Sequence, residues 1–173
     1  GPHPPPGPGP FVNLQGDEPM VPAVLVDQVA GVLEAHPQDA IGALASKVAT
    51  LNAFLDPNVV KVITDAQGRA LYFSRAPIPW GRDSAPAGLA SQRGFAGARR
   101  HVGLYAYRVE ALRRLSMSPP SLLEQIEKLE QLRALEAGLS IRVAEAQVAP
   151  GPDVNTPEDL VRVERLILAG GES

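Results

Sequence analysis

The sequence predicts an α/β fold built around a mixed β-sheet, and three observations support this prediction. Apolar, β-rich runs alternate with segments of helical periodicity along the 173 residues, which is typical of a layered sheet. Two β-rich runs at 59–64 and 70–74 are separated by Asp65-Ala66-Gln67-Gly68, which predicts an antiparallel hairpin. Residues 76–98 carry three prolines, four glycines and no periodic pattern, so they predict a long loop that leaves the sheet.

The N-terminal part begins with a Pro/Gly-rich segment and continues as strand, helix and strand. Residues 1–10 read GPHPPPGPGP. This composition cannot pack a core and has few amide donors, so we interpret it as a tag remnant or linker before one domain at 11–173. Phe11–Leu14 predicts a short buried strand, Ala23–Ala35 a helix, and 41–48 a second strand. The predicted apolar face of the helix comprises Leu25, Val29, Val32 and Leu33.

The C-terminal part predicts a strand, two helices, a strand and a final helix. The strands are expected at 101–107 and 141–148, and a short helix at 108–115. A longer helix is expected at 121–137, ended by Gly138. Its core stripe would be Leu122, Ile126 and Leu129. The last helix would open at Thr156, with Pro157 in its first position and Asp159 completing a capping-box arrangement.

Composition excludes several classes of site and partner. The net charge of −3 disfavours nucleic-acid binding, which requires a basic surface. The absence of cysteine excludes disulfides, thiolate zinc sites and a cysteine nucleophile. No apolar run approaches the ~20 residues of a membrane span, and no signal peptide is visible. We therefore expect a cytoplasmic protein with no membrane or nucleic-acid partner.

Two acidic segments are candidate metal sites. Gln15-Gly16-Asp17-Glu18-Pro19 follows the first predicted strand, and the carboxyl ends of strands are where open α/β sheets bind ligands. One or two carboxylates suffice for Mg²⁺, but a tight turn that needs Gly and Asp explains these residues equally well. Residues 153–160 place further oxygen ligands before the last helix, where helix capping is the default interpretation.

Two candidate binding surfaces follow or lie on predicted strands. Arg75 ends an aromatic strand and could clamp a carboxylate, although a surface ion pair is the commoner role of such a residue. His101, Gly103, Tyr105 and Tyr107 alternate along one strand and therefore share a face. That face could bind sugar hydroxyls, or it could simply be one side of an amphipathic strand.

A third candidate surface lies on the predicted helix at 121–137. Glu127, Glu130 and Gln131 have helical spacing, which places them on one side of such a helix. Two carboxylates and an amide could hydrogen-bond a polyol. A solvated helix face is the commoner explanation.

These segments, in this order, resemble one family. The blocks are QGDEP at 15–19, FSRAPIPW at 73–80, RHVGLYAYR at 100–108, LEQLR at 129–133 and NTPEDL at 155–160. Over residues 11–168 the chain resembles CMP-Kdo synthetase, the 3-deoxy-manno-octulosonate (Kdo) cytidylyltransferase. The resemblance implies an incomplete Rossmann-like nucleotidyltransferase sheet, with helices on both faces and a hairpin and loop that form a dimerisation excursion.

The family resemblance also implies an activity and partners. CMP-Kdo synthetases transfer a cytidylyl group from CTP to Kdo, release pyrophosphate and supply lipopolysaccharide synthesis. The reaction needs positioning and charge neutralisation by Mg²⁺. The family is homodimeric, so a homodimer is expected here.

The same resemblance assigns roles to residues of this chain. Asp17 would be the catalytic, metal-binding carboxylate, with Asn155 as the second metal ligand. The substrate-binding residues would be Gln15, Arg75, His101, Tyr105, Glu130 and Gln131. Hydroxyl and carboxylate groups of an acid sugar match the donors and acceptors of these side chains.

Two departures from the family pattern affect the expected activity. The family's basic P-A-R-x-x-S-x-R-x-x-x-K loop, which grips the CTP phosphates, has no counterpart in this sequence, so we expect the chain alone not to catalyse transfer. The family has Asp where this chain has Asn155, and Mg²⁺ prefers charged oxygens. Two alternatives stay open: a non-catalytic Kdo-binding or dimerisation fragment, and a cytidylyltransferase for 8-amino-Kdo or a sialic-acid-like sugar.

Overall fold

The computed structural model describes residues 9–14 and 21–150, and their strands form one mixed sheet of six strands. The strand order is β4-β3-β5-β2-β6, with β1 paired to β5 outside this path. The strands are β1 Phe11–Leu14, β2 Ile41–Lys47, β3 Lys61–Thr64, β4 Ala70–Ser74, β5 Arg99–Tyr107 and β6 Ile141–Glu145. The helices are α1 Ala23–Ala35, α2 Leu51–Leu55, α3 Val109–Met117, α4 Leu122–Glu127 and α5 Gln131–Glu136, with a 3₁₀ turn at Leu89–Ser91.

The sheet is mixed because β5 is antiparallel to its neighbours, whereas β2 and β6 are parallel. β5 pairs with β2 along its whole length. On its other side it pairs with β1 over residues 104–107 and with β3 at Arg100. β6 then extends the sheet beside β2, from the Ile41–Ile141 pair to the Ala45–Glu145 pair. The predicted α/β class with a mixed sheet is confirmed.

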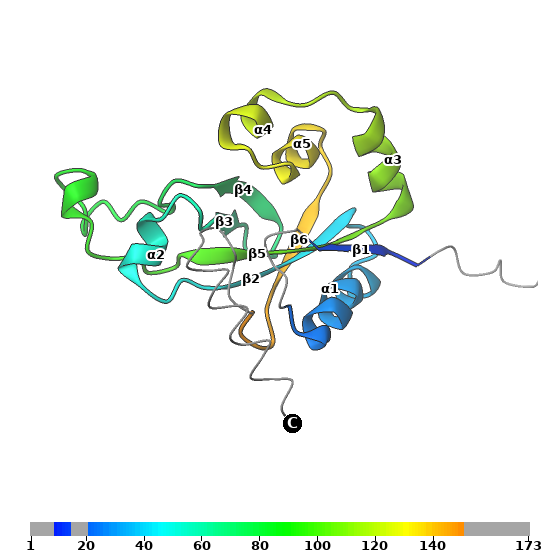
Figure 1. The fold of residues 1–173 in the computed structure, drawn as a ribbon, viewed down its shortest axis with the longest axis horizontal. Helices are drawn as coiled ribbons and strands as arrows, with labels where there is room; N and C mark the ends of the chain where they lie inside the picture. Colours follow the sequence, from blue (N-terminus) through cyan, green and yellow to red (C-terminus); the bar gives the residue numbers. More distant parts are fainter. Residues whose placement is uncertain (1–8, 15–20, 151–173) are drawn as a thin grey trace, which may run out of the picture.

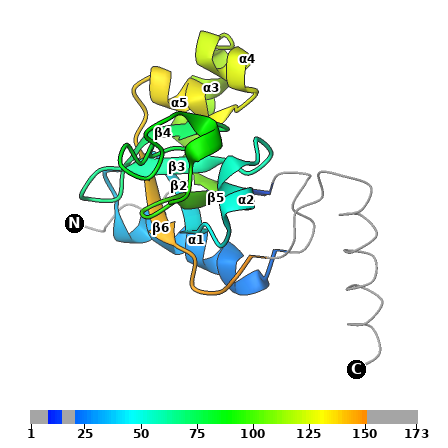
Figure 2. The ribbon, with the colours of Figure 1, turned by 90° about the vertical axis from the view of Figure 1, so that its left-hand side faces the viewer.

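Helices cover both faces of the sheet, as Figures 1 and 2 show. Helix α1 packs on one face, where Leu25, Val29 and Leu33 meet β5 residues Val102 and Leu104. Helices α3, α4 and α5 gather over the other face. This second core contains Tyr105 and other buried apolar residues: Ile41, Ala43, Val62, Phe73, Leu132, Ile141 and Val143. The alternation along β5 therefore divides its side chains between the two layers, as its sequence predicts.

Of the predicted excursion only the long loop leaves the sheet, and it lies with α2 at one end of the molecule (Figure 1). The β3–β4 hairpin is part of the sheet, and its turn contacts β6 through the Arg69–Arg142 bridge. In the hairpin turn the Asp65 N–H donates to the Arg69 carbonyl over 2.8 Å, and Gly68 has φ of 88°, a conformation that suits glycine. Phe54 of α2 and Phe95 of the loop pack with ring centroids 6.2 Å apart. The sequence interpretation missed α2, although its Thr50 cap, which accepts from the Ala53 N–H, is a recognisable helix-start signal.

Two predictions about local structure are wrong. The helix expected at 121–137 is divided into α4 and α5 because Lys128 adopts a left-handed conformation, with φ of 56°. The division leaves Leu122 and Ile126 at 70% and 66% exposed, and of the predicted core stripe only Leu129 is buried. The strand β1 forms as expected, but Phe11 is 54% exposed and Val12 39%. Among the described residues β1 has β5 as its one partner strand, so it lies at a margin of the sheet.

Other predictions fall outside the described residues or differ in length. The loop at 15–19 and the helix expected from Thr156 belong to segments that the structure does not describe. The strand expected at 141–148 ends at Glu145. Gly138 follows α5 with φ of 78°, which confirms its predicted role in ending the helix.

Candidate functional site

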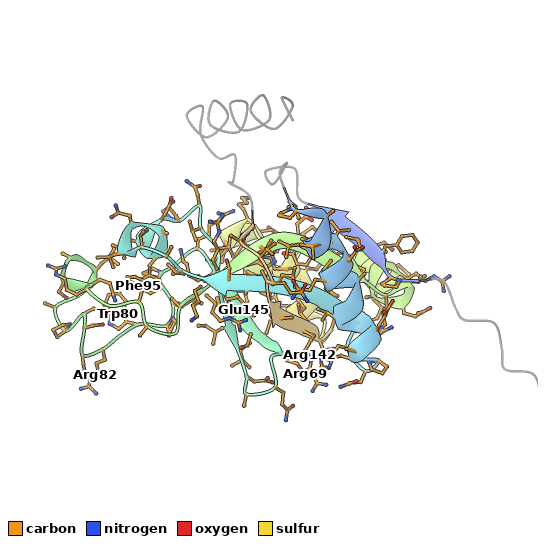
Figure 3. All side chains as sticks on the ribbon, turned by 90° about the horizontal axis from the view of Figure 1, so that it is seen from below. Arg69, Trp80, Arg82, Phe95, Arg142 and Glu145 are labelled. Atoms are coloured by element: carbon orange, nitrogen blue, oxygen red, sulfur yellow. The ribbon has the colours of Figure 1, made fainter. Side chains whose placement is uncertain are left out.

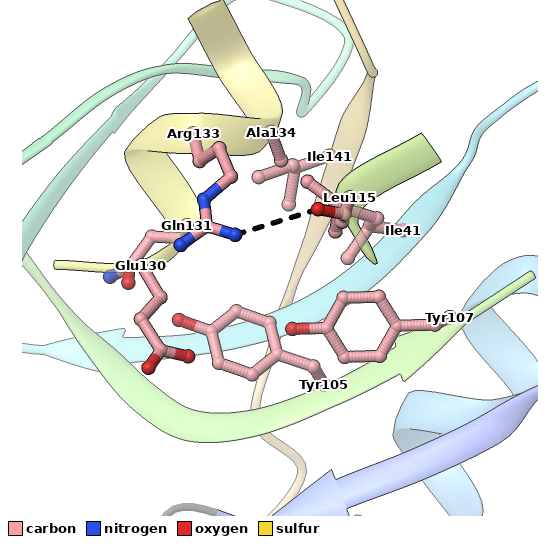
Figure 4. Close-up of a pocket in the computed structure, with 9 residues that line it drawn as sticks. All are labelled: Ile41, Tyr105, Tyr107, Leu115, Glu130, Gln131, Arg133, Ala134 and Ile141. Carbon is pink, nitrogen blue, oxygen red and sulfur yellow. Dashed lines mark hydrogen bonds between the residues drawn. The ribbon is translucent and has the colours of Figure 1, made fainter. Parts of the chain in front are cut away.

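A cavity of about 190 Å³ lies between the sheet and helices α3 and α5. Strand β5 contributes Tyr105 and Tyr107, and the start of α5 contributes Glu130 and Gln131 (Figure 4). The full lining comprises Ile41, Tyr105, Tyr107, Leu115, Glu130, Gln131, Arg133, Ala134 and Ile141. The structure thus brings together three residues that the sequence proposed for substrate binding, namely Tyr105, Glu130 and Gln131.

The break between α4 and α5 explains how Glu130 and Gln131 reach this cavity. Lys128 turns the chain with φ of 56° and ψ of 48°, and Leu129 then buries its side chain in the core. Glu130 occupies the N-cap position and Gln131 begins α5. Both residues therefore stand at a helix start that faces β5, instead of along the exposed side of one continuous helix.

Gln131 is the most informative residue of the cavity. It is 5% exposed, and neither its amide oxygen nor its amide nitrogen has a hydrogen-bond partner within the described residues. Buried amide groups are almost always paired, since leaving one unpaired costs about 1–3 kcal/mol. A side chain of this kind in a cavity indicates a binding position for a molecule with both donors and acceptors.

Aromatic rings on β5 form the wall next to Gln131. The Tyr105 ring lies 4.9 Å from the His101 ring and 5.7 Å from the Tyr107 ring, between centroids. Burial, together with the negative charge of Glu130, raises the pKa of Tyr107 to about 12. The Tyr107 hydroxyl therefore keeps its proton at neutral pH and can donate a hydrogen bond into the cavity.

His101 lies behind Tyr105 and does not line the cavity. Burial, with a smaller contribution from the positive charge of Arg100, lowers its pKa to about 3. The imidazole is therefore neutral at physiological pH. Its Nε2 atom has no hydrogen-bond partner in the part of the chain that the structure describes, so it can still serve as a polar contact next to Tyr105.

Arg133 is a cavity residue that the sequence interpretation missed. Its Nε and Nη2 atoms donate to the two carboxylate oxygens of Glu124 over 2.8 and 2.6 Å. These hydrogen bonds hold the pKa of Glu124 below its ordinary value. The guanidinium charge is therefore largely compensated within the protein. The alternation along the strand had already placed Tyr107 on the candidate face, whereas Arg133 carries no such signal, because residues two positions apart on a helix do not share a face.

Arg75 lies outside the cavity lining and is bound by the protein itself. Its Nε, Nη1 and Nη2 atoms donate to the carbonyls of Glu127, Pro57 and Lys128. The Glu127 carboxylate in turn accepts from the Ser74 hydroxyl and the Arg75 backbone N–H. Contact between Arg75 and a substrate stays a prediction. The predicted common helix face of Glu127, Glu130 and Gln131 does not form, because Glu127 ends α4 and Gln131 begins α5.

Comparison with known proteins gives the family. A model described as "Cytidylyltransferase" matches residues 10–141. The chain belongs to the cytidylyltransferase family. It is 49% identical over 156 residues to the 3-deoxy-manno-octulosonate cytidylyltransferase of Pseudomonas syringae pv. syringae, covering 90% of this chain and 61% of that protein. It is 51% identical over 163 residues to the enzyme of the same name from Alkalilimnicola ehrlichii, covering 92% and 62%.

Solved structures agree with this assignment. The fold matches CMP:2-keto-3-deoxy-manno-octonic acid synthetase complexed with CTP at a TM-score of 0.77 and 36% identity, covering 95% of this chain and 64% of that chain. The inositol-1-phosphate CTP transferase from T. maritima matches at a TM-score of 0.54 and 16% identity, which is a likeness of fold. The chain spans about 61–62% of the length of the curated relatives it matches.

Three predicted site residues of the cytidylyltransferase chain, Gln15, Asp17 and Asn155, lie outside the described residues. Within residues 9–14 and 21–150, no three acidic or histidine side chains cluster as a metal site would require. The magnesium assignment therefore stays a prediction. In the same part of the chain, no helix combines the length and apolar character that a membrane-spanning segment needs.

Proposed function

We propose that this chain forms the acceptor-binding part of an enzyme that transfers a cytidylyl group from CTP to Kdo, giving CMP-Kdo and pyrophosphate. Membership of the cytidylyltransferase family supports the reaction class. Relatives at 49–51% identity that are named 3-deoxy-manno-octulosonate cytidylyltransferase support Kdo as the acceptor. The likeness to a synthetase complexed with CTP supports the nucleotide donor.

The observation that carries the proposal is the unpaired, buried amide of Gln131. A polyhydroxylated acid offers hydroxyl groups that both donate and accept, which matches an amide with one donor group and one acceptor. The Tyr107 hydroxyl and the Glu130 carboxylate add a donor and an acceptor at the same cavity. Together these groups would orient the sugar and exclude water, so that its anomeric hydroxyl is held toward the nucleotide.

Magnesium is the cofactor that we propose with this reaction. Asp17 and Asn155 would hold it, and both supply the hard oxygen ligands that Mg²⁺ prefers, although the Asn155 amide lacks the charge of a carboxylate. When bound, the ion would neutralise negative charge on the nucleotide phosphates. A carboxylate and an amide are a sufficient donor set, since Mg²⁺ usually keeps several water ligands.

We further propose that the enzyme is a cytoplasmic homodimer whose product feeds lipopolysaccharide synthesis. Exposed apolar side chains on the hairpin and long loop support the dimer: Leu71 is 60% exposed, Leu89 58% and Trp80 44%. Contact with a second copy would remove these apolar side chains from water, which favours association. Light scattering after size-exclusion chromatography tests the dimer, and a monomeric mass at high concentration would contradict it.

Titration calorimetry tests the acceptor site directly. We expect the chain to bind Kdo, and the Gln131→Leu variant to lose about tenfold to 100-fold in affinity because it removes two hydrogen-bonding atoms. Gln125→Leu is the matched control, since Gln125 is exposed and its side chain donates only to the Pro120 carbonyl in the described structure. Equal Kdo affinities for the Gln131 and Gln125 variants would contradict the proposal.

Other ligands separate the alternatives in the same experiment. A non-catalytic module is expected to bind Kdo and not CTP. Tighter binding of 8-amino-Kdo or of a sialic acid than of Kdo would reassign the acceptor. Release of pyrophosphate from CTP with Kdo and Mg²⁺ measures whether this chain itself performs transfer.

A further inference from the structure

Arg75 joins two turns that are distant in sequence. Its Nη1 atom donates to the Pro57 carbonyl over 2.9 Å, in the turn between α2 and β3. Its Nε and Nη2 atoms donate to the Glu127 and Lys128 carbonyls over 2.6 and 3.2 Å, in the turn between α4 and α5. Three nitrogens of one guanidinium thus have backbone partners, which suits the fixed fork geometry of arginine.

The α4–α5 turn requires such support because it contains a non-glycine residue in the left-handed region. Lys128 has φ of 56° and ψ of 48°, a conformation that costs backbone free energy for any residue with a Cβ atom. Arg75 binds the carbonyls of Lys128 itself and of the preceding residue. The Glu127 carboxylate closes the contact by accepting from the Ser74 hydroxyl over 2.8 Å and from the Arg75 N–H over 2.9 Å.

The turn determines where the Gln131 side chain points. Leu129, next to Lys128, is buried, and its carbonyl accepts from the Leu132 N–H. Gln131 lies between them as the first residue of α5 and lines the cavity (Figure 4). A change in the backbone at Lys128 would therefore rotate or shift the start of α5, and the Gln131 side chain would move with it.

We propose that Arg75 is a positioning residue, which holds the left-handed turn at Lys128 and thereby fixes the Gln131 side chain at the wall of the cavity. It acts through the backbone of 127–128, without belonging to the cavity lining. The bond to Pro57 also ties the turn after α2 to the α4–α5 turn. That this position serves a bound sugar acid rests on the proposed function, whereas the coupling of Arg75 to Gln131 does not.

Nuclear magnetic resonance of the ligand-free chain tests this coupling through the ¹H–¹⁵N resonances of the Gln131 side-chain amide. These resonances are assigned because they disappear from the spectrum of the Gln131→Leu variant. We expect Arg75→Ala to shift or broaden these resonances and the backbone amide of Leu129. Arg113→Ala is the matched control, because Arg113 is exposed and pairs only with Glu110 three residues away in the described structure. It should leave the Gln131 resonances unchanged.

A second substitution distinguishes positioning from direct contact. Glycine adopts the left-handed conformation without strain, so Lys128→Gly should restore the turn in the absence of Arg75. The Arg75→Ala/Lys128→Gly double variant is expected to recover the Gln131 resonances and to bind Kdo within about twofold of the unchanged chain, against a loss of about tenfold for Arg75→Ala alone. If Arg75 contacts the ligand directly, the double variant will bind Kdo as weakly as Arg75→Ala does, and the positioning role will be contradicted.

The outcomes separate this proposal from the proposed function. Gln131 resonances that are unchanged in Arg75→Ala would overturn the coupling, whether or not Kdo binds. Absence of Kdo binding by every protein, with the resonance shift and its recovery intact, would overturn the acceptor and leave the coupling standing. Should Arg75→Ala fail to fold, Arg75→Lys provides the test, since a single ammonium cannot span three carbonyls and a shift of the same resonances is expected.

Discussion

Two groups of buried polar side chains in this chain are built in opposite ways. In the first, the Asp39 carboxylate is completely buried and paired, with Oδ1 accepting from Arg69 Nε over 2.8 Å and Oδ2 from Arg142 Nε over 2.7 Å. Arg142 also donates to the Gln67 carbonyl. Arg69 and Arg142 lie next to each other (Figure 3) and form an isolated β-bridge. In the second group, Gln131 and His101 are almost as buried as Asp39. The two amide atoms of Gln131 and the Nε2 atom of His101 nevertheless have no hydrogen-bond partner within the described residues.

This difference indicates that the first group stabilises the fold, whereas the second is suited to binding a ligand. Burial by itself would raise the pKa of Asp39, but hydrogen bonds from Arg142, Arg69 and Ser140 hold it below its ordinary value. This group joins the start of β2, the hairpin turn and β6, and both carboxylate oxygens of Asp39 accept hydrogen bonds within the protein. The second group contains polar atoms without hydrogen-bond partners in the described residues, and such atoms lower the stability of the fold unless another molecule binds them.

The largest expected effect breaks the paired group. Asp39→Ala leaves Arg69 and the buried Arg142 without their counter-ion, and removal of one partner from a buried ion pair costs about 3–5 kcal/mol. Denaturant unfolding measures this loss. Glu110→Ala, at an exposed pair with Arg113, is the control and should cost less than about 1 kcal/mol. Similar losses for the two variants would show that Asp39 does not stabilise the fold as argued.

An intermediate effect is expected from His101 as the pH falls. Its pKa is about 3 in the folded chain and 6.5 when unperturbed. Between these values the unfolded chain binds a proton that the folded chain does not, so stability decreases as the pH drops through this window. From pH 7 to pH 5.5 the loss from this residue is about 1 kcal/mol.

The His101→Phe variant isolates this contribution, because a phenyl ring can keep the contacts with Phe73 and Tyr105 and does not titrate. The free energy of unfolding is measured for both proteins at pH 7 and pH 5.5. The unchanged chain should lose about 1 kcal/mol more than the variant, since all other titrating groups are common to the two. Equal losses would mean that His101 is solvated in solution.

Much of the fold was predictable because short-range patterns determine it. The hairpin follows from its turn residues, the face of β5 from alternation, and α1 from helical periodicity. The division of the helix expected at 121–137 could not be predicted, because lysine is a good helix former and no neighbouring residue indicates a left-handed conformation at Lys128. The turn depends on contacts with Arg75, which lies more than fifty residues earlier in the sequence.

The candidate site was predictable in part for a related reason. The resemblance to a family supplied Tyr105, Glu130 and Gln131, and the cavity brings these three together. The surroundings of Arg75 could not be predicted, because its partners are backbone carbonyls, which carry no signature in the sequence. Arg133 was missed because its role depends on how α5 packs against α3 and α4.

The smallest expected change in stability, that of Gln131→Leu, gives the sharpest contrast with Asp39. Leucine has a similar volume and no polar atoms, and replacing an unpaired buried amide by an apolar group is nearly neutral or stabilising by up to about 1 kcal/mol. Thermal and denaturant unfolding of the ligand-free chain measure this change. The same variant is expected to weaken Kdo binding, so stability and affinity would move independently or in opposite directions. A loss of more than about 2 kcal/mol would mean that Gln131 is paired in the free protein, and the distinction between the two groups would then fail.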